Sequence, residues 1–311
     1  MASGNGQHVL AVIGATGHQG GSVVDFVLND PELSKTHKIM ALTRDPSKPA
    51  AKKLAERGAE VVKCDLEDSH QLKKVLDGAD IMYAMTAMAA GGPSELEVGK
   101  RLADAAHDAG IKHLIYSTLP NASKISNGKY KVPHFDDKAA TEDYIRQSQV
   151  PHTFFCPGFF MENFLTMMAP QPKGDGTYVV QGRAKPETKI PMISATVDTG
   201  NYVGAILANP DKYLGTVVVG SCGCLSMDEV VKTMSEVTGK TVTYEQISKE
   251  EYLPSLPKEF REDLINMFAY YDEFGFFGDL TSEAVAEAEK KPRKPVLSLK
   301  EFLQKNPLSL N

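Results

Sequence analysis

The 311-residue sequence lacks the segments that mark membrane and secreted proteins. No apolar run approaches the roughly 20 residues that a spanning helix needs, and Met1 to Gln7 do not form a basic region followed by an apolar one. The chain also has no internal repeat and no low-complexity tract. We therefore expect a compact protein of about two domains that resides in the cytoplasm without membrane attachment.

Motifs for metal binding and hydrolysis are missing as well. The chain has four cysteines, Cys64, Cys156, Cys222 and Cys224, without the paired spacing of a zinc site. In the absence of a secretory signal, we expect them to be reduced, buried thiols. The eight histidines never fall at ligand spacing with a second histidine and a carboxylate, so we expect no metal site. No Gly-x-Ser-x-Gly motif follows a strand, which argues against serine hydrolysis.

Neither sign of charge dominates a long stretch of the chain. The net charge is -6, and acidic and basic residues are interspersed, so we expect no direct binding to nucleic acid. One basic cluster contains Lys290, Lys291, Arg293 and Lys294. Such a cluster is found in nuclear-import signals, which would add a nuclear location, and more often in solvated turns before a last helix.

Strand-like and helix-like segments alternate regularly from residue 8 to about 156. Short β-branched runs are separated by stretches in which apolar residues recur every three or four positions, which indicates a parallel sheet wound by helices. The expected strands are 8–15, 38–43, 60–66, 79–85, 112–117 and 152–156, and the expected helices are 22–29, 50–57, 69–76, 95–109 and 135–148. The pattern predicts a doubly wound α/β Rossmann domain over residues 1–156.

The alternation ends at Pro157 and Gly158, and residues 157–311 are less regular. Helices are expected at 227–238 and 249–268 within a smaller α+β lobe. A further β run at 216–220 predicts that part of the segment 190–221 returns to the Rossmann sheet. The lobe would then be interleaved with the first domain.

A glycine-rich loop follows the first expected strand. Its three spaced glycines permit a tight turn, a close approach of the backbone to a pyrophosphate, and the packing of helix on strand. The following helix N-terminus adds free N–H groups and a partial positive charge. We expect a dinucleotide to bind here through Gly14, Thr16, Gly17, His18, Gln19 and Gly20.

The residues after the second expected strand favour NADP(H) over NAD(H). An acidic side chain there would bind the ribose 2′-hydroxyl, but the strand ends in Thr43 and Arg44, with Lys48 nearby. A guanidinium matches a 2′-phosphate in charge and planar geometry. Asp45 follows directly, and we interpret it as a cap for the next helix rather than a ribose ligand. Asp65, after the third strand, either binds the adenine edge or caps the strand end.

Several segments together resemble the NmrA-like family of atypical short-chain dehydrogenases. They are residues 14–21, 43–46, 134–138, 141–146 and 157–163, and the likeness covers nearly the whole chain. The resemblance implies a Rossmann domain and a small C-terminal lobe, with the nicotinamide ring in the cleft between them. It also implies two competing roles. Some relatives are dinucleotide-sensing regulators that bind transcription factors or enzymes, whereas isoflavone-reductase-like relatives are NADPH-dependent reductases.

Only half of the usual short-chain dehydrogenase pair is present. That pair is Tyr-x-x-x-Lys, in which the lysine lowers the tyrosine pKa and holds the ribose while the phenol passes a proton. The matching residues here are His134 and Lys138, and the reductase-type relatives imply that the lysine alone suffices. We expect Lys138 to bind the ribose and to donate a proton, the alternative being an exposed helix lysine. His134 either shuttles a proton or is a structural or solvent-facing residue at the helix start.

Residues that follow the later strands should line the cofactor cleft, because ligands gather at the carboxyl ends of parallel strands. Ser117 and Thr118 either orient a substrate carbonyl or are simple polar groups at a strand end. The cofactor contacts expected in this region are Met85, Thr86, Ser117, Lys138, Cys156, Pro157, Gly158 and Phe159.

Methionine and aromatic residues supply a soft apolar surface that could bury a hydrophobic substrate, pack the small lobe, or do both. They are Met161, Phe164, Met167, Met168, 267–271 and 274–277. The sequence predicts an NADP(H)-dependent oxidoreductase for a small hydrophobic carbonyl, enone or similar compound. The alternatives are a non-catalytic NADP(H) redox sensor that co-regulates transcription through protein partners, and a hydride carrier that returns the cofactor unchanged. No motif specifies an oligomeric state.

Overall fold

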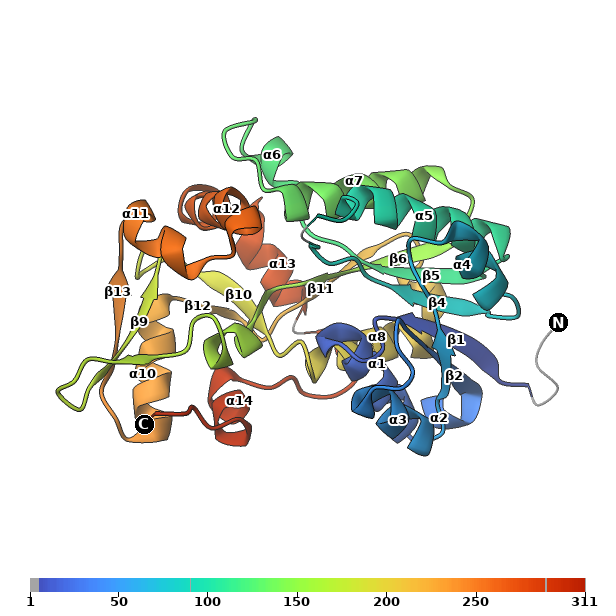
Figure 1. The fold of residues 1–311 in the computed structure, drawn as a ribbon, viewed down its shortest axis with the longest axis horizontal. Helices are drawn as coiled ribbons and strands as arrows, with labels where there is room; N and C mark the ends of the chain where they lie inside the picture. The colour runs from blue at the N-terminus through green and yellow to red at the C-terminus, as the bar shows by residue number, and fades with distance from the viewer. Residues whose placement is uncertain (1–5, 90, 289, 311) are drawn as a thin grey trace.

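A seven-stranded parallel sheet forms the centre of the larger lobe (Figure 1). The computed structural model describes residues 6–89, 91–288 and 290–310. The strands of this sheet are β1 His8–Ile13, β2 His37–Thr43, β3 Glu60–Lys63, β4 Ile81–Ala84, β5 His113–Ser117, β6 His152–Pro157 and β11 Val217–Gly220. Their order is β11-β6-β5-β4-β1-β2-β3. The predicted doubly wound Rossmann fold is confirmed.

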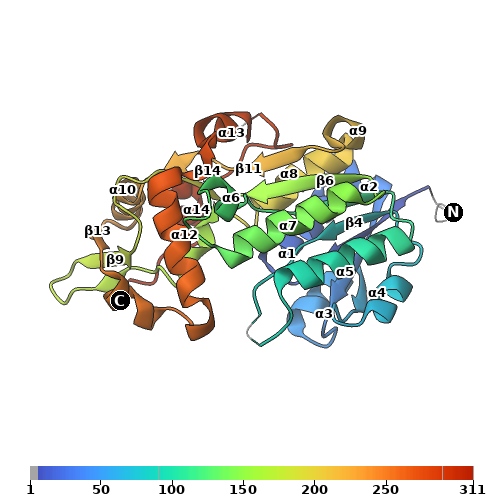
Figure 2. The ribbon, with the colours of Figure 1, turned by 90° about the horizontal axis from the view of Figure 1, so that it is seen from above.

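Helices cover both faces of this sheet (Figures 1 and 2). One face carries α4 Ser69–Val75, α5 Glu95–Asp108 and α7 Pro133–Gln147, and the other carries α1 His18–Asn29, α2 Leu33–Thr36, α3 Pro49–Glu56 and α8 Asp198–Ala208. The core is accordingly split in two, with Val24 and Ile206 in one cluster and Leu102 and Ile145 in the other. Burial on both faces explains why the strands are continuous apolar runs.

The chain returns to this sheet after its first excursion into the smaller lobe. Helix α8 packs against α1, and β11 pairs in parallel with β6 from Val217 opposite Phe154 to Gly220 opposite Pro157. The short helix α9 Pro210–Tyr213 connects the two. The smaller lobe is therefore interleaved with the larger one, while the domain boundary between residues 156 and 157 stays a prediction.

The smaller lobe contains two three-stranded sheets and the last helices. The sheets have the orders β12-β10-β7 and β13-β9-β8. The elements are β7 Phe159–Phe160, a 3₁₀ helix Met161–Leu165, β8 Gln171–Pro172, β9 Tyr178–Gly182, β10 Ile190–Ile193, β12 Cys224–Leu225, α10 Met227–Thr238, β13 Val242–Gln246, α11 Lys249–Tyr252, α12 Arg261–Phe274, β14 Phe276–Asp279, α13 Thr281–Ala288 and α14 Leu299–Lys305. Its core also takes in Phe135 from α7 and Ala122 from α6 Ala122–Ile125, so the two lobes pack together.

The single helix expected over residues 249–268 is wrong. Helix α11 ends at Tyr252, and the 3₁₀ turns Leu253–Ser255 and Lys258–Phe260 precede α12. Pro254 and Pro257 lie in this break. Because proline lacks an N–H group and its ring clashes with the preceding turn, it interrupts an α-helix. Helix α12 therefore starts independently of α11.

The basic cluster before α14 is largely engaged with the folded chain. Arg293 donates to Asp30 at 2.8 and 3.1 Å and also pairs with Glu32, while the Lys294 ammonium lies over the ring of Phe26. These contacts favour the interpretation of the cluster as a turn. Within the described ranges, every helix is too short or too polar to span a bilayer.

Asp198, at the start of α8, is a fully buried carboxyl group. Its Oδ2 accepts a hydrogen bond from the backbone N–H of Leu297 at 3.1 Å, and burial raises its pKa to about 6. The folded state therefore binds this proton more tightly than an exposed aspartate with a pKa of 3.8. Ionisation of Asp198 therefore begins to lower the free energy of unfolding above pH 3.8, the pKa of an exposed aspartate, and the loss is complete above about pH 6, the pKa in the folded protein.

Replacement of Asp198 by Asn should remove this cost. In urea unfolding experiments, we expect Asp198→Asn to exceed the wild type in free energy of unfolding by up to about 3 kcal/mol near pH 8, and by about half of that near pH 5. Comparing both proteins at each pH cancels other titrations, such as that of His113, whose pKa burial lowers to about 4. A difference that did not change with pH would contradict the assignment.

Candidate functional site

The glycine-rich loop makes a tight turn between β1 and α1. Gly14 has a φ of 66°, and the N–H of Gly17 donates to the Gly14 carbonyl oxygen at 2.8 Å. A Cβ atom at Gly20 would lie 2.3 Å from that same oxygen, so only glycine lets the first turn of α1 approach the loop. The N–H groups of His18, Gln19 and Gly20 open the helix and have no intrahelical acceptor. The loop thus fits a phosphate group.

Two cationic side chains follow β2, the strand beside this loop. The strand ends are adjacent, because the N–H of Ala15 donates to the carbonyl oxygen of Leu42 at 3.4 Å. Thr43 ends β2, and Arg44 and Lys48 follow it with exposed side chains. Neither cation forms a side-chain hydrogen bond or ion pair with any residue that the structure describes. Two free cations beside a phosphate loop suit a further phosphate.

The two acidic residues near these strand ends bond to their own neighbours. Asp45 Oδ1 accepts from the N–H and the hydroxyl of Ser47 at 2.9 and 2.6 Å. It stabilises a turn, whereas the N-cap position of α3 belongs to Lys48, so the expected cap of the helix is wrong. Asp65 Oδ1 accepts from the N–H of Glu67 at 3.0 Å, which is the geometry of a strand-end turn.

A cavity of about 400 Å³ lies where the carboxyl ends of β1, β4, β5 and β6 meet the smaller lobe. Its polar lining residues are Gln19, Thr86, Glu95, Ser117, His134, Lys138 and Asn163. Its other lining residues are Met85, Ala87, Met88, Leu119, Phe135, Pro157, Gly158, Phe159, Phe160, Met167, Met168, Pro257, Phe260, Leu264, Met267, Phe268, Tyr271 and Phe276. The fold therefore brings the residues expected from four strand ends together with an apolar wall.

Lys138 is buried at the polar end of this cavity. Its Nζ donates to the backbone oxygen of Thr86 at 2.8 Å and to Thr86 Oγ1 at 2.9 Å, and it forms an ion pair with Glu95. Burial lowers the pKa of Lys138, and the carboxylate of Glu95 opposes that shift. An ammonium group has three donors, so these three acceptors occupy all of them. The alternative of an exposed helix lysine is wrong.

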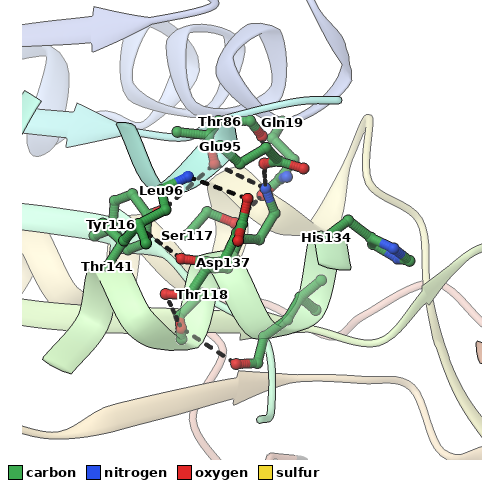
Figure 3. Close-up of polar contacts among 12 residues, drawn as sticks. Gln19, Thr86, Glu95, Leu96, Tyr116, Ser117, Thr118, His134, Asp137 and Thr141 are labelled. Atoms are coloured by element: carbon green, nitrogen blue, oxygen red, sulfur yellow. Dashed lines mark hydrogen bonds and ion pairs between the residues drawn. The ribbon is translucent and has the colours of Figure 1, made fainter. Parts of the chain in front are cut away.

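Gln19 and Ser117 form a second buried polar group on the cavity wall (Figure 3). Gln19 Oε1 accepts from Ser117 Oγ at 2.8 Å and from the hydroxyl of Tyr83 at 2.9 Å. Within the described chain, the Nε2 of Gln19 has no hydrogen-bond partner. The Thr118 hydroxyl donates instead to the Leu119 carbonyl oxygen at 3.4 Å and lies outside this cavity.

His134, in the first turn of α7, is held by a carboxylate from the smaller lobe. Its Nδ1 lies 2.6 Å from Asp263 Oδ1, and its backbone N–H donates to Asp263 Oδ2 at 3.2 Å. The two side chains are only 12% and 9% exposed, so His134 does not face solvent. In Figure 3 its imidazole is directed away from Thr86 and Glu95. His134 and Lys138 nevertheless line the same cavity.

Of the cofactor contacts expected after the later strands, Cys156 does not line the cavity. Its thiol is buried beside Val219 and Ala288, and burial raises its pKa. Successive side chains of a strand point to opposite faces, so Cys156 turns away while Pro157 lines the cavity. The sequence prediction assigned both Cys156 and Pro157 to the cofactor cleft because it considered only their position near the strand end. It did not consider to which face of the sheet each side chain points.

The soft apolar residues serve both purposes that the sequence suggested. Met168, Met267 and Phe268 line the cavity and are also buried in the core of the smaller lobe. Met161 and Phe164 are fully buried in that core and do not line the cavity. The apolar wall is therefore an extension of the core.

Sequence reasoning missed two acidic residues of this site. Glu95 begins α5 directly after its N-cap Ser94, and Asp263 lies in the first turn of α12. The only local signal is an acidic residue at a helix start, which normally indicates no more than a favourable interaction with the helix dipole. Their pairing with Lys138 and His134 joins residues far apart in the chain.

The close approach of Gly20 to Gly14 can be tested by a substitution that adds one methyl group at position 20. Gly20→Ala should lower the free energy of unfolding by about 3 kcal/mol, since the Cβ would meet backbone atoms that cannot move aside. The matched control is Gly21→Ala, whose Cβ would lie 3.5 Å from the nearest atom, an ordinary contact. Urea unfolding measures both, and equal stability of the two variants would refute the packing argument.

Comparison with known proteins identifies the family. The NmrA-like family model matches residues 6–303. The chain is 32% identical over 306 residues to an NmrA-like family domain-containing protein of Dictyostelium discoideum, which covers 95% of this chain and 97% of the relative. It is 31% identical over 338 residues to the NmrA-like family domain-containing oxidoreductase FrzB of Cladobotryum sp, with 96% and 98% coverage.

A solved structure agrees with this match. The fold is similar to that of NmrA, a negative transcriptional regulator, in complex with NADP, with a TM-score of 0.82, 25% identity and coverage of 97% of this chain and 95% of the other. A second structure of NmrA, in complex with NAD, has a TM-score of 0.83, 25% identity and the same coverage. This chain therefore belongs to the NmrA-like family.

Proposed function

We propose that this protein is an NADP(H)-dependent oxidoreductase that transfers hydride to or from a small hydrophobic molecule. The observation that carries the proposal is the cavity of about 400 Å³, whose wall is apolar and whose polar groups converge at the strand ends. Sites for small molecules are typically concave and apolar, with a few placed polar groups. The oxidoreductase named among the relatives supports the same reaction class.

The described residues fit the coenzyme. The amides of the glycine-rich loop would hold the pyrophosphate, and Arg44 and Lys48 would hold the 2′-phosphate. The coenzyme, when bound, supplies or accepts the hydride. The Nε2 of Gln19 and the group around Thr86 would border its nicotinamide half, because both lie at the strand ends where the order of the sheet reverses. The NADP complex of NmrA supports this arrangement. Because NmrA also forms a complex with NAD, we expect Arg44 and Lys48 to decide which of the two coenzymes this protein prefers.

Lys138 could bind the coenzyme only by giving up one of its present hydrogen bonds. Its three donors are bonded to Thr86 and Glu95, so a ribose hydroxyl would have to replace one of these acceptors. Without such an exchange, Lys138 holds the end of β4 and the start of α5 in position at the cavity. The remaining cofactor contacts stay predictions: Met85, Pro157, Gly158 and Phe159.

The second candidate function is a regulator that responds to its NADP(H) load through protein partners. The occupied donors of Lys138 favour it, since a reductase of this type would need that lysine free for the ribose. The relative NmrA is itself a transcriptional regulator. The assay below separates the two functions, because a regulator would bind NADPH without oxidising it.

Filling the apolar part of the cavity should block turnover and leave coenzyme binding intact. Leu264 of α12 lines the cavity, so Leu264→Trp would occupy the space of a substrate. With NADPH and a panel of aromatic ketones and enones, we expect the wild type to consume NADPH, and Leu264→Trp to lose at least about tenfold in kcat/KM. Absorbance of the nicotinamide band measures the rate, and calorimetry measures NADPH affinity.

The matched control places the same indole outside the cavity. Leu280 precedes α13 and is 60% exposed, so Leu280→Trp should keep wild-type turnover. If the wild type bound NADPH and consumed none with the whole panel, the oxidoreductase function would be abandoned in favour of the regulator.

Reversing the charge of Arg44 should change the choice of coenzyme. Arg44→Asp would remove a charge-assisted contact and place a carboxylate where a 2′-phosphate would lie, so NADPH affinity should fall at least about tenfold while NADH affinity is kept or rises. Lys52→Asp makes the same charge reversal on exposed α3 and should leave both affinities unchanged. Calorimetry with both coenzymes is decisive, and an unaltered preference in Arg44→Asp would disprove the role of Arg44.

A further inference from the structure

We propose that His134 and Asp263 form a proton-donating dyad for the reduction of a carbonyl or enone in the cavity. The proposal rests on the proposed oxidoreductase function and names its missing proton donor. His134 stands where a short-chain dehydrogenase carries tyrosine. Asp263 comes from α12, the helix that closes the apolar side of the same cavity.

The lysine of the pair is a poor donor in this arrangement. All three hydrogen-bond donors of Lys138 are directed to the backbone oxygen of Thr86, the Thr86 hydroxyl and the carboxylate of Glu95, so none points freely at a substrate. A proton lost from Lys138 would also leave the buried carboxylate of Glu95 without its counter-charge, which is costly in a buried site. His134 is another group on the same cavity wall that can carry a proton.

His134 has the geometry that this task needs. Both carboxylate oxygens of Asp263 hold it, one through Nδ1 at 2.6 Å and the other through the backbone N–H at 3.2 Å. Among the described residues, Nε2 has no partner, and His134 lines the cavity. One ring nitrogen is thus fixed by the protein, and the other has no protein partner among the described residues.

The carboxylate gives the ring both orientation and charge stability. A buried carboxylate that accepts the Nδ1 proton of a histidine fixes the tautomer and stabilises the imidazolium. Asp263 is 8% exposed, so its interaction with the ring is weakly screened. The other ionisable residues on the cavity wall are Glu95 and Lys138, which pair with each other, and Tyr271, whose pKa burial raises. None of these replaces the imidazole as a mobile acid.

The proposed step balances with these groups. The substrate carbon receives a hydride from the reduced coenzyme, a C–H bond forms, and the π bond to the carbonyl oxygen breaks. The electron pair moves to that oxygen, either directly in a ketone or through conjugation in an enone. The oxygen takes the proton from Nε2 of protonated His134, the Nε2–H bond breaks, and the neutral imidazole later recovers a proton from solvent. Asp263 stays ionised throughout.

The test uses benzylideneacetone, an aromatic enone, as the probe with the full-length protein and NADPH. His134→Gln keeps an amide that can donate to Asp263 but cannot transfer a proton, so kcat should fall about 100-fold while NADPH affinity is unchanged. Asp263→Asn should lower kcat as well.

A matched histidine variant separates the dyad from a general effect. His152 is held through Nδ1 by the Val150 carbonyl oxygen at 2.8 Å and does not line the cavity, so His152→Gln should keep wild-type kcat. The proposal is overturned if His134→Gln keeps the kcat of the wild type. A wild type that binds NADPH but consumes none with any compound of the ketone and enone panel removes the oxidoreductase function itself.

A second measurement does not depend on turnover. Nitrogen NMR of the histidine rings in coenzyme-free protein should show the neutral His134 ring with its proton on Nδ1, as the contact with Asp263 requires. Asp263→Asn should redistribute that proton towards Nε2, since the amide can offer an N–H group in place of a carboxylate oxygen. A ring with its proton on Nε2 in the wild type would overturn the dyad.

Discussion

The buried ammonium of Lys138 is the interaction on which the site depends. A charge can be buried only when it is paired and hydrogen-bonded, and Lys138 meets that condition through Thr86 at the end of β4 and Glu95 at the start of α5. Helix α7 must therefore converge with the end of β4 and the start of α5, which precede Lys138 by 52 and 43 residues. This convergence sets the polar end of the cavity beside the glycine-rich loop, where a coenzyme would lie.

The opposite end of the cavity has a different physical character. Its apolar wall belongs to the core of the smaller lobe, so the residues that would contact a substrate also stabilise the fold. Helix α12 contributes to this wall and is tied to the larger lobe by Asp263, and by Glu273, which accepts from the hydroxyl of Tyr130 at 2.9 Å. These polar contacts tie α12 to the larger lobe. A single cavity therefore combines a polar end with an apolar end.

The chain passes back and forth between the two lobes. After its first passage through the smaller lobe, the chain adds α8 and β11 to the Rossmann core and then returns to form α10 and the helices that follow. The close packing of α8 on α1 requires Gly200, where a Cβ would lie 2.1 Å from the Ser22 carbonyl oxygen. Helix α1, which follows the glycine-rich loop, is therefore packed against α8 from the second half of the chain.

The sequence by itself determined the Rossmann sheet, the glycine-rich loop and the cationic Arg44, because these depend on local periodicity and spacing within short segments. Only the tertiary structure decided that Lys138 is buried against Glu95, that His134 pairs with Asp263, and that Cys156 faces away from the cavity. The physical reason is the distance along the chain over which each interaction acts. Backbone geometry follows from neighbours in the chain, whereas the partner of a buried charge and the facing of a side chain depend on residues brought together by packing.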